Sequence, residues 1–278
     1  IRLLGGTLSN TIGGASAGRG NILSGNLSHG IGIYNTGTVS NVIASNLIGT
    51  NLSGTSPLPN ALHGIVVQEA ASSNVITGNL ISGNGSDGVN LNGAGTRMNL
   101  VLANRIGTNL AGTAAISNAG NGVAILSGAS ENRIGAFTLP FEVNTISGNG
   151  LVGMLVGGMT SISNTLRANR VGASLNGMAA IPNRGAGVSL QTTRANTVCG
   201  NGLGSIIAGN AGPGIWINGG RENRVDNVCQ IGVAADGATA LGNGLSTRQA
   251  GISLTNTISN LILPGLIAYN GGAGIAVT

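Results

Sequence analysis

The chain has 278 residues, of which 51 are glycine, 41% are apolar, 7% are charged and 2% are aromatic. This aliphatic content is too high for a disordered or collagen-like chain, although such chains can also be rich in glycine. Glycine, asparagine or serine interrupts every apolar stretch before the roughly 18 residues of a membrane span, so we expect no transmembrane segment. The net charge of +5 is the balance of twelve arginines, spread along the chain, against seven acidic residues. Without a basic stripe, this charge argues against nucleic-acid binding.

An internal repeat runs along the chain, and its first element is a glycine followed by aliphatic, any residue and aliphatic. The element recurs nine times, at intervals of 23 to 37 residues that alternate between long and short. We expect each copy to be a short strand whose two aliphatic side chains point inward. The copies begin at Gly30, Gly64, Gly88, Gly122, Gly153, Gly187, Gly214, Gly251 and Gly274.

Two further elements contain asparagine. One reads Asn-x-aliphatic and begins at Asn41, Asn74, Asn99, Asn132, Asn164, Asn196, Asn223 and Asn260; the other closes short turns at Asn26, Asn84, Asn149, Asn210 and Asn270. Glycine and asparagine tolerate the left-handed backbone of a sharp corner, and stacked asparagine side chains can form hydrogen-bonded ladders. Each turn therefore carries about three short strands, with no helical period of 3.6 residues.

These turns predict an all-β fold, a single-stranded right-handed parallel β-helix of about nine coils with alternating long and short turns. Excursions at 49–64, 107–122, 172–187 and 232–251 predict four loops that project on one side as a ridge. The chain begins and ends at the same strand position. We therefore expect residues 1–278 to form one β-helix domain that is part of a longer array, or a subunit that stacks head to tail.

The sequence also resembles a known group of proteins. Residues 10–26 read NTIGGASAGRGNILSGN, and residues 46–55 read NLIGTNLSGT. Both resemble the repeats of bacterial secreted or cell-surface right-handed parallel β-helix repeat proteins, and the match covers essentially the whole chain. The resemblance implies a pectate-lyase-like superfamily fold and a secreted or cell-surface location, but no particular activity. These relatives often have Asp after Gly-Thr, where this chain has Asn51, Asn109, Ser174 and Ala235, which argues against ion binding there.

The carboxylates are the first candidates for catalysis, because glycoside hydrolysis needs two of them about 5 to 9.5 Å apart. Glu131 and Glu222 occupy equivalent positions, but three turns separate them by roughly 14 Å. Glu222 and Asp226 lie nearer to each other and remain the catalytic candidates. The local pattern Glu-Asn-Arg predicts instead that these glutamates form solvated pairs with Arg133 and Arg224.

The histidines and the remaining acids give no metal or triad motif. We expect His29 and His63 to fall at different places in their turns, with no acid in register with either. Asp87, Asp226 and Asp236 lie on different coils, so they do not predict an acidic calcium cluster. We therefore expect no metal and no cofactor.

The candidate binding residues lie on strands. Strand alternation turns Trp216 outward, with Ser189 and Ser253 beside it on adjacent turns, and such an indole could stack on a sugar ring or lie under a loop. Arg105 and Arg170 share one position two turns apart, roughly 10 Å, and are candidates for contact with an anionic polymer.

The two cysteines, Cys199 and Cys229, are interpreted as buried unpaired thiols, with a disulfide between them as the alternative. With few ionisable residues left for chemistry, the leading hypothesis is a non-enzymatic, adhesin-like extracellular β-solenoid scaffold whose expected partner is polysaccharide or another cell-surface polymer. The first alternative is a polysaccharide lyase or glycoside hydrolase on the same fold. The second is a head-to-tail self-assembling fibre subunit.

Overall fold

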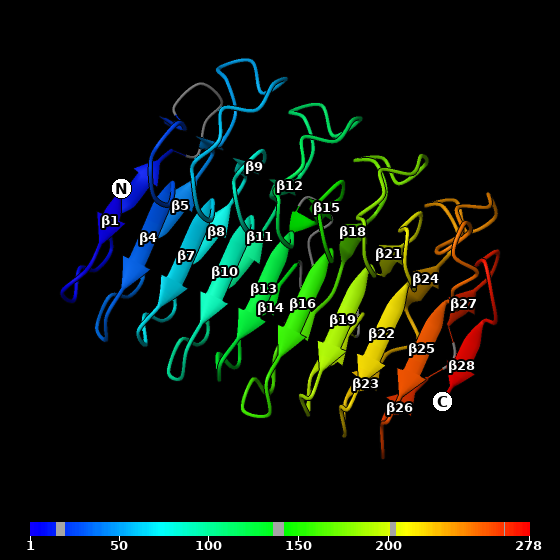
Figure 1. The fold of residues 1–278 in the computed structure, drawn as a ribbon. Coiled ribbons are helices and arrows are strands. Elements are labelled where there is room, and N and C mark those ends of the chain that lie inside the picture. The colour runs from blue at the N-terminus through cyan, green and yellow to red at the C-terminus, as the bar shows by residue number, and fades with distance from the viewer. Residues whose placement is uncertain (15–19, 136–141, 201–203, 264) are drawn as a thin grey trace.

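The computed structural model describes residues 1–14, 20–135, 142–200, 204–263 and 265–278. The chain winds as a right-handed parallel β-helix, with three sheets along its length and the two termini at opposite ends (Figure 1). The predicted fold class is confirmed. Within the described ranges there is no α-helix, and hence none long and apolar enough to cross a membrane.

Each coil contributes one strand to each sheet, and successive coils pair in parallel. The first sheet has ten strands: β1 (Arg2–Leu3), β4 (Ile31–Tyr34), β7 (Ile65–Gln68), β10 (Val89–Asn92), β13 (Val123–Leu126), β16 (Met154–Gly157), β19 (Val188–Gln191), β22 (Ile215–Asn218), β25 (Ile252–Thr255) and β28 (Ile275–Val277). The second has nine: β2 (Thr11–Gly13), β5 (Val42–Ala44), β8 (Val75–Thr77), β11 (Leu100–Leu102), β14 (Arg133–Ile134), β17 (Thr165–Leu166), β20 (Thr197–Val198), β23 (Arg224–Val225) and β26 (Leu261–Ile262). The third has nine: β3 (Ile22–Leu23), β6 (Leu47–Ile48), β9 (Leu80–Ile81), β12 (Arg105–Ile106), β15 (Asn144–Ile146), β18 (Asn169–Val171), β21 (Ser205–Ile207), β24 (Cys229–Ile231) and β27 (Leu266–Ile267).

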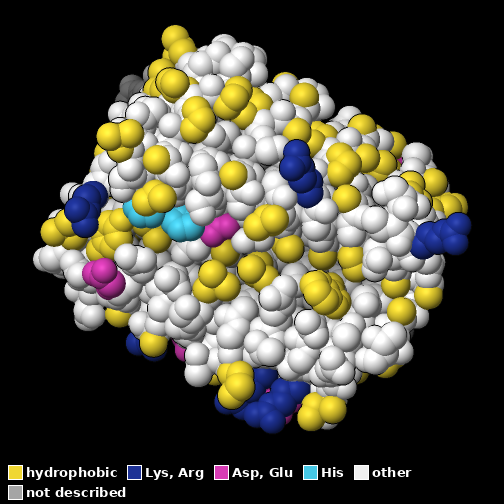
Figure 2. Space-filling model, viewed as in Figure 1, with side chains coloured by type: hydrophobic (Ala, Val, Ile, Leu, Met, Phe, Trp, Pro, Cys, Tyr) yellow, Lys and Arg dark blue, Asp and Glu magenta, His cyan; other side chains and the backbone are white. Residues whose placement is uncertain are grey.

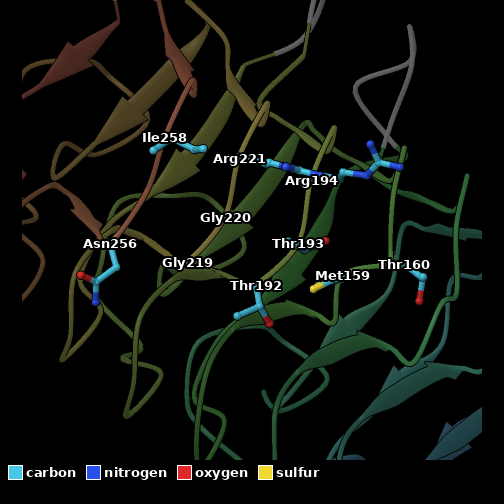
Figure 3. A pocket seen from close by; sticks show the side chains of 10 residues that line it. All are labelled: Met159, Thr160, Thr192, Thr193, Arg194, Gly219, Gly220, Arg221, Asn256 and Ile258. Atoms are coloured by element: carbon cyan, nitrogen blue, oxygen red, sulfur yellow. The ribbon is translucent and has the colours of Figure 1, made fainter.

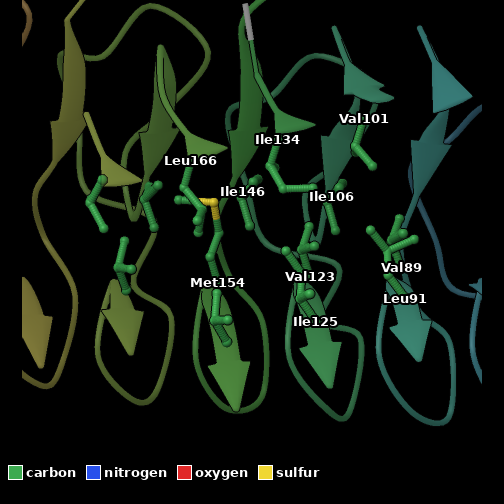
Figure 4. Packing of buried hydrophobic residues seen from close by; sticks show 14 of the residues in the cluster. Val89, Leu91, Val101, Ile106, Val123, Ile125, Ile134, Ile146, Met154 and Leu166 are labelled. Carbon is green, nitrogen blue, oxygen red and sulfur yellow. The ribbon is translucent and has the colours of Figure 1, made fainter. Parts of the chain in front are cut away.

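The core consists of the aliphatic side chains that the repeat predicts to point inward. Ile31, Ile33, Ile125 and Ile217 are fully buried, and the same positions of neighbouring coils stack on them. Figure 4 shows side chains of the first sheet pointing toward those of the other two sheets. The glycine before each first-sheet strand lies close to this core: a Cβ at Gly88 would lie 2.5 Å from Ile106 Cγ2. Any larger residue there would push two sheets apart.

Three asparagine ladders run along the corners. In each, the amide oxygen of one asparagine accepts N–H groups from the asparagine of the preceding coil: Asn99 Oδ1 accepts the backbone N–H of Asn74 at 3.0 Å and its Nδ2 at 3.2 Å. Such bonds satisfy polar groups that the corners would otherwise bury without partners. The ladder before the second sheet comprises Asn10, Asn41, Asn74, Asn99, Asn132, Asn164, Asn196, Asn223 and Asn260.

The backbone explanation for these asparagines was wrong. At the corner before the second sheet, the left-handed residue is the one that precedes the ladder asparagine, as at Ser73 (φ 55°), Glu131 (φ 56°) and Glu222 (φ 55°). The asparagine itself follows the turn and is selected for its side-chain amide, which bonds the neighbouring coils. Its position therefore depends on hydrogen bonding and not on tolerance of positive φ.

The prediction of two free thiols was also wrong, because Cys199 and Cys229 form a disulfide. Cys229 pairs with Ser205 in the ladder that runs through Asn104, Asn144 and Asn169 before the third sheet. Side chains of this ladder reach back to the preceding coil: Asn104 Nδ2, for example, donates to Ile76 O at 2.9 Å. A cysteine at this position therefore faces the corner of the coil before it, where Cys199 lies, and the two Cα atoms are 5.5 Å apart.

The four long loops form the predicted ridge and rise on the same side of the β-helix (Figure 1). Each loop closes on itself through an antiparallel bridge, and each bonds the next: Leu110 N–H donates to Gly54 O, Leu175 N–H to Gly112 O and Ala235 N–H to Gly177 O, at 2.9 to 3.0 Å. Asn51 Oδ1 accepts the N–H groups of Thr55 and Ser56, so this side chain caps its own loop. In the fourth loop the equivalent residue is Ala234, not Ala235, because Ala234 N–H donates to Thr239 O as Asn51 N–H donates to Ser56 O.

Candidate functional site

A row of polar side chains runs across the amino-terminal ends of successive first-sheet strands. Each of these residues directly precedes the glycine that stands before its strand. His29, His63, Asp87 and Asn121 occupy this position before β4, β7, β10 and β13, and we call these four residues the His–Asp row. Because successive first-sheet strands pair in register, the four side chains stack along the axis. Figure 2 shows the two histidines, in cyan, side by side on this face, with an acidic side chain in magenta continuing their line.

The two imidazoles are stacked and neutral at pH 7. Their ring centroids are 5.2 Å apart, with an interplanar angle of 1°. His29 Nδ1 accepts the backbone N–H of His63 at 3.3 Å, and His63 Nδ1 accepts that of Asp87 at 3.2 Å. Burial lowers the pKa of both histidines; at His29 the neighbouring His63 and Arg2 lower the pKa further, whereas at His63 the Asp87 carboxylate opposes the shift. These bonds favour the tautomer with the ring proton on Nε2.

Asp87 is held in place by its neighbours. Its side chain is 10% exposed, and three N–H groups bind it: Asn121 backbone N–H and Nδ2 donate to Oδ1 at 2.8 and 2.9 Å, and Asn90 Nδ2 donates to Oδ2 at 2.8 Å. Asp87 Oδ2 also lies 3.4 Å from His63 Nδ1. Because that nitrogen accepts a backbone N–H, this contact is an ion pair only when His63 is protonated. The carboxylate is therefore poised to stabilise a proton taken up by His63.

A hollow of about 280 Å³ adjoins the row at His29, and Arg2 and Tyr34 line it. The Arg2 guanidinium carbon lies 5.2 Å from the centre of the Tyr34 ring, within the range of a cation–π contact. The Tyr34 ring lies over Gly32, where a Cβ would collide with it. Burial raises the pKa of Tyr34, with Arg2 opposing and Glu69 adding to the shift, so the phenol stays protonated at neutral pH. The hollow thus offers a guanidinium, a phenol and an imidazole.

Trp216 lies on the same face, five strands from His63 and so about 24 Å along the axis. It pairs with Ser189 on one side and Ser253 on the other, in the predicted register. The indole is half-buried, and its Nε1 donates to Thr255 Oγ1 at 3.4 Å. Ser189 is completely buried, whereas Ser253 is partly exposed. Trp216 and Ser253 are therefore the members of this trio that have surface exposed.

Arg105 and Arg170 lie two rungs apart on the third sheet, in register through Thr145. Both are partly buried, and burial lowers the pKa of Arg170. A Cβ added at Gly177, in the third long loop, would lie 3.6 Å from Arg170 Nε. These arginines thus lie on a different sheet from the His–Asp row and do not extend it.

Glu222 and Asp226 lie in different surroundings. Asp226 is 3% exposed, and its Oδ1 accepts Arg224 Nε at 2.8 Å and Nη2 at 2.7 Å. Glu222 is exposed and lies 4.0 Å from both Arg194 and Arg221. The predicted pairing of Glu222 with Arg224 was wrong, because strand β23 directs Arg224 toward the acid two residues later.

The His–Asp row was missed in the sequence, and a signal for it was present. The prediction that His29 and His63 fall at different places in their turns was wrong, as was the prediction that no acid is in register with them. Both histidines and Asp87 directly precede the glycine of the first repeat element, in His-Gly-Ile, His-Gly-Ile and Asp-Gly-Val. Counting from that glycine places them on consecutive coils. In the described part of the chain, no group of three or more His, Cys, Asp or Glu side chains is arranged to hold a metal ion.

The fold is shared with enzymes that act on polysaccharides. A double mutant of the periplasmic alginate epimerase AlgG superposes with a TM-score of 0.59 at 14% identity, over 86% of this chain and 47% of that protein. The alginate lyase from Paenibacillus sp. str. FPU-7 gives a TM-score of 0.51 at 15% identity, over 96% of this chain and 82% of the lyase. The chain thus spans about half the length of the epimerase. No family profile and no curated protein sequence matches it.

These superpositions define the class of the protein. It is a right-handed parallel β-helix, the fold that its repeats predict. At this level of identity the likeness concerns the fold alone, so function has to be argued from the side chains of the His–Asp row and its neighbours.

Proposed function

We propose that this β-helix acts on an acidic polysaccharide by lyase- or epimerase-type proton transfer at the His–Asp row. The observation that carries the proposal is the juxtaposition of two neutral imidazoles and an anchored carboxylate with a hollow that contains Arg2 and Tyr34. The structural neighbours that act on alginate support a polysaccharide as the substrate.

The proposed chemistry begins at the carbon next to the carboxylate of a uronate. Arg2 binds that carboxylate. The His63 ring first exchanges its Nε2 proton with solvent for one on Nδ1, which gives up the backbone N–H of Asp87 and donates to Asp87 Oδ2. The free Nε2 then accepts the C5 proton. In a lyase, the C5–H and C4–O bonds then break, a C4–C5 double bond forms, and the protonated Tyr34 supplies a proton to the leaving oxygen. In an epimerase, the C4–O bond stays intact and the protonated Tyr34 returns a proton to C5 from the opposite face. Asp87 stabilises the imidazolium in both cases.

The experiment is incubation with alginate, polygalacturonate and a neutral glucan, with recovery of bound polymer from the same samples. Elimination is read from the ultraviolet absorbance of unsaturated products, and epimerisation from deuterium uptake at C5 by NMR. We expect turnover of a uronate polymer that falls by about 10²-fold or more in His63→Ala. Asp87→Asn removes the charge and keeps one acceptor oxygen for the two Asn121 donors, at the loss of the bond from Asn90 Nδ2. It should lower the rate while leaving polymer retention intact.

A second function is favoured by Trp216, whose half-buried indole lies on the same face between Ser189 and Ser253. In this alternative the β-helix is a non-enzymatic rod that holds polysaccharide. Retention of polymer without elimination or exchange, lost in Trp216→Ala and kept in His63→Ala, would support the binding rod and refute the enzymatic proposal. A turnover that survives in the double variant His29→Ala/His63→Ala would place the chemistry elsewhere.

We also propose a secreted or cell-surface location. Disulfides persist in oxidising compartments and are rare in a reducing cytosol. The buried Cys199–Cys229 bridge supports this assignment. Fractionation followed by alkylation of free thiols tests it, with a reduced pair in a cytosolic fraction as the contrary result.

A further inference from the structure

A second hollow lies where the turns between the first and second sheets become short. The turn after β16 covers residues 158–164, whereas those after β19 and β22 cover only 192–196 and 219–223. The short turns form the floor of a hollow of about 500 Å³. Met159 stands on one side and Ile258 on the other, 76% and 66% exposed (Figure 3).

Two arginines of adjacent coils occupy this hollow. Arg194 and Arg221 are bridge partners, so their Cα atoms lie about 4.8 Å apart. Their side chains are 45% and 54% exposed and lie next to each other in Figure 3. Like charges at this spacing repel. Packing of the coil does not require this pair, because both side chains point into solvent.

Glu222 offsets this repulsion without filling the arginines' hydrogen-bonding capacity. Its carboxylate oxygens lie 4.0 Å from Arg194 Nη1 and from Arg221 Nε. These distances are too long for hydrogen bonds. The guanidinium groups therefore keep donors for an external anion, with which Glu222 competes electrostatically. This arrangement gives Glu222 a role other than the catalytic one considered from the sequence.

The pair is unusual within the repeat. The residue two positions before each asparagine of the ladder at this corner is Leu8, Val39, Ser72, Arg97, Ser130, Ile162, Arg194, Arg221 and Ile258 in turn. Among these described positions, only the seventh and eighth coils place arginines next to each other. Arg97 has serines on both neighbouring coils and provides a matched single arginine on the same edge.

We propose that the arginine hollow, lined by Arg194, Arg221, Met159 and Ile258, is a separate binding site for the carboxylate or sulfate group of an acidic polysaccharide. Paired guanidinium groups bind planar or tetrahedral oxyanions through parallel N–H bonds. Met159 and Ile258 offer apolar walls for the C–H surface of a sugar ring, as in other pockets that combine apolar walls with a few polar groups. The arginine hollow lies at the turns that follow the first-sheet strands, whereas the His–Asp row lies at the opposite ends of these strands. Binding at the arginine hollow does not depend on the proposed catalysis.

The test is NMR titration with a galacturonate hexamer, a sulfated oligosaccharide, a neutral glucan hexamer and a short single-stranded DNA. The backbone amide signals of Gly219 and Gly220 report this hollow alone, so binding at the His–Asp row does not interfere. We expect the uronate or the sulfated ligand to shift these signals. The Kd should be about tenfold weaker in Arg194→Ala and in Arg221→Ala, unchanged in Arg97→Ala and tighter in Glu222→Gln.

Three results would overturn the proposal. The first is the absence of shifts at these glycines with both acidic sugars. The second is an equal loss of affinity in Arg97→Ala, which would show non-specific attraction to positive charge. The third is binding of the DNA as tightly as the sugars, which would show a general polyanion site. The ratio of the Kd values for the galacturonate hexamer and the sulfated oligosaccharide shows whether the hollow prefers a carboxylate or a sulfate. His63→Ala should leave these titrations unchanged, so the failure of the enzymatic proposal is distinguishable from the failure of this one.

Discussion

At the residue scale, His29 and His63 connect the candidate site to the stability of the fold. Each accepts a backbone N–H from the next coil at Nδ1, and burial lowers the pKa of each below the usual value of about 6.5. The unfolded chain therefore binds protons at a higher pH than the folded chain does. The stability from these neutral imidazoles is present above about pH 6.5 and is lost as the pH falls from there toward the folded-state pKa.

We therefore expect the free energy of unfolding to decrease between pH 7 and pH 5. The chain has only two histidines, so the double variant His29→Gln/His63→Gln removes imidazole titration altogether. Urea denaturation at a series of pH values checks this, with each single variant retaining part of the dependence. An equally steep pH dependence in the double variant would assign the effect to carboxylates instead.

The candidate site shows what sequence can and cannot give at this scale. The inward aliphatics and the outward direction of Trp216 follow from alternation, which is local. The partners of Arg224, Asp226 and Glu222 depend on side-chain paths across a corner, which spacing does not reveal. The alignment of the His–Asp row on consecutive coils could have been predicted from the sequence, because each of its residues is followed by the glycine of the first repeat element.

At the element scale, the Cys199–Cys229 disulfide links two coils at the point where the asparagine ladder before the third sheet ends. The ladder runs from Asn21 to Asn169 and then passes to Ser205, which has one hydroxyl in place of an amide. The disulfide joins this coil to the next across 30 residues of sequence. The sequence did not favour this bridge, because the two cysteines fall at different positions in their coils: Cys199 directly follows β20, whereas Cys229 begins β24. Spacing along the sequence does not reveal that a corner brings their side chains together.

We expect Cys199→Ser/Cys229→Ser to lower the free energy of unfolding by about 3 to 4 kcal/mol, the chain-entropy value for a loop of this length. Denaturation with and without reductant measures this change, and reductant should have no effect on the variant. The variant Cys199→Ala/Cys229→Asn should recover part of the loss, because its amide restores a ladder residue next to Ser205. Equal stability of the native and reduced proteins would show that the bridge adds nothing to the fold.

At the scale of the whole molecule, the fold was predictable because each coil repeats the same physical solution. Inward aliphatics, glycines at close approaches and corner asparagines recur in the sequence at the period of the coil, so many weak signals agree. The long loops were predictable in place and length for the same reason. The hydrogen bonds between these loops could not be predicted from the sequence. They join loops two coils apart through backbone N–H and C=O groups, which every residue type can supply.

The continuity of the corner ladder makes the effect of one substitution depend on its place along the rod. Asn164 is fully buried in the middle: its Oδ1 accepts two N–H groups from Asn132, and its Nδ2 donates to Asn196 Oδ1 and Ala129 O. Asn164→Ala leaves the buried backbone N–H of Asn132 without its acceptor and removes one donor each from Ala129 O and Asn196 Oδ1, so it should cost about 3 kcal/mol.

In a protein made of residues 1–278, Asn10 is the matched control, because it is exposed and donates to Asn41 Oδ1. Asn10→Ala removes one donor each from Asn41 Oδ1 and Leu8 O, both near solvent, and its cost should stay below about 1 kcal/mol. Urea denaturation compares the two variants, and hydrogen exchange shows whether the amides of coils adjacent to the change open first, as expected when each coil contacts only its neighbours. Equal costs at both positions would mean that the ladder bonds contribute little and that the aliphatic core alone sets the stability of the rod.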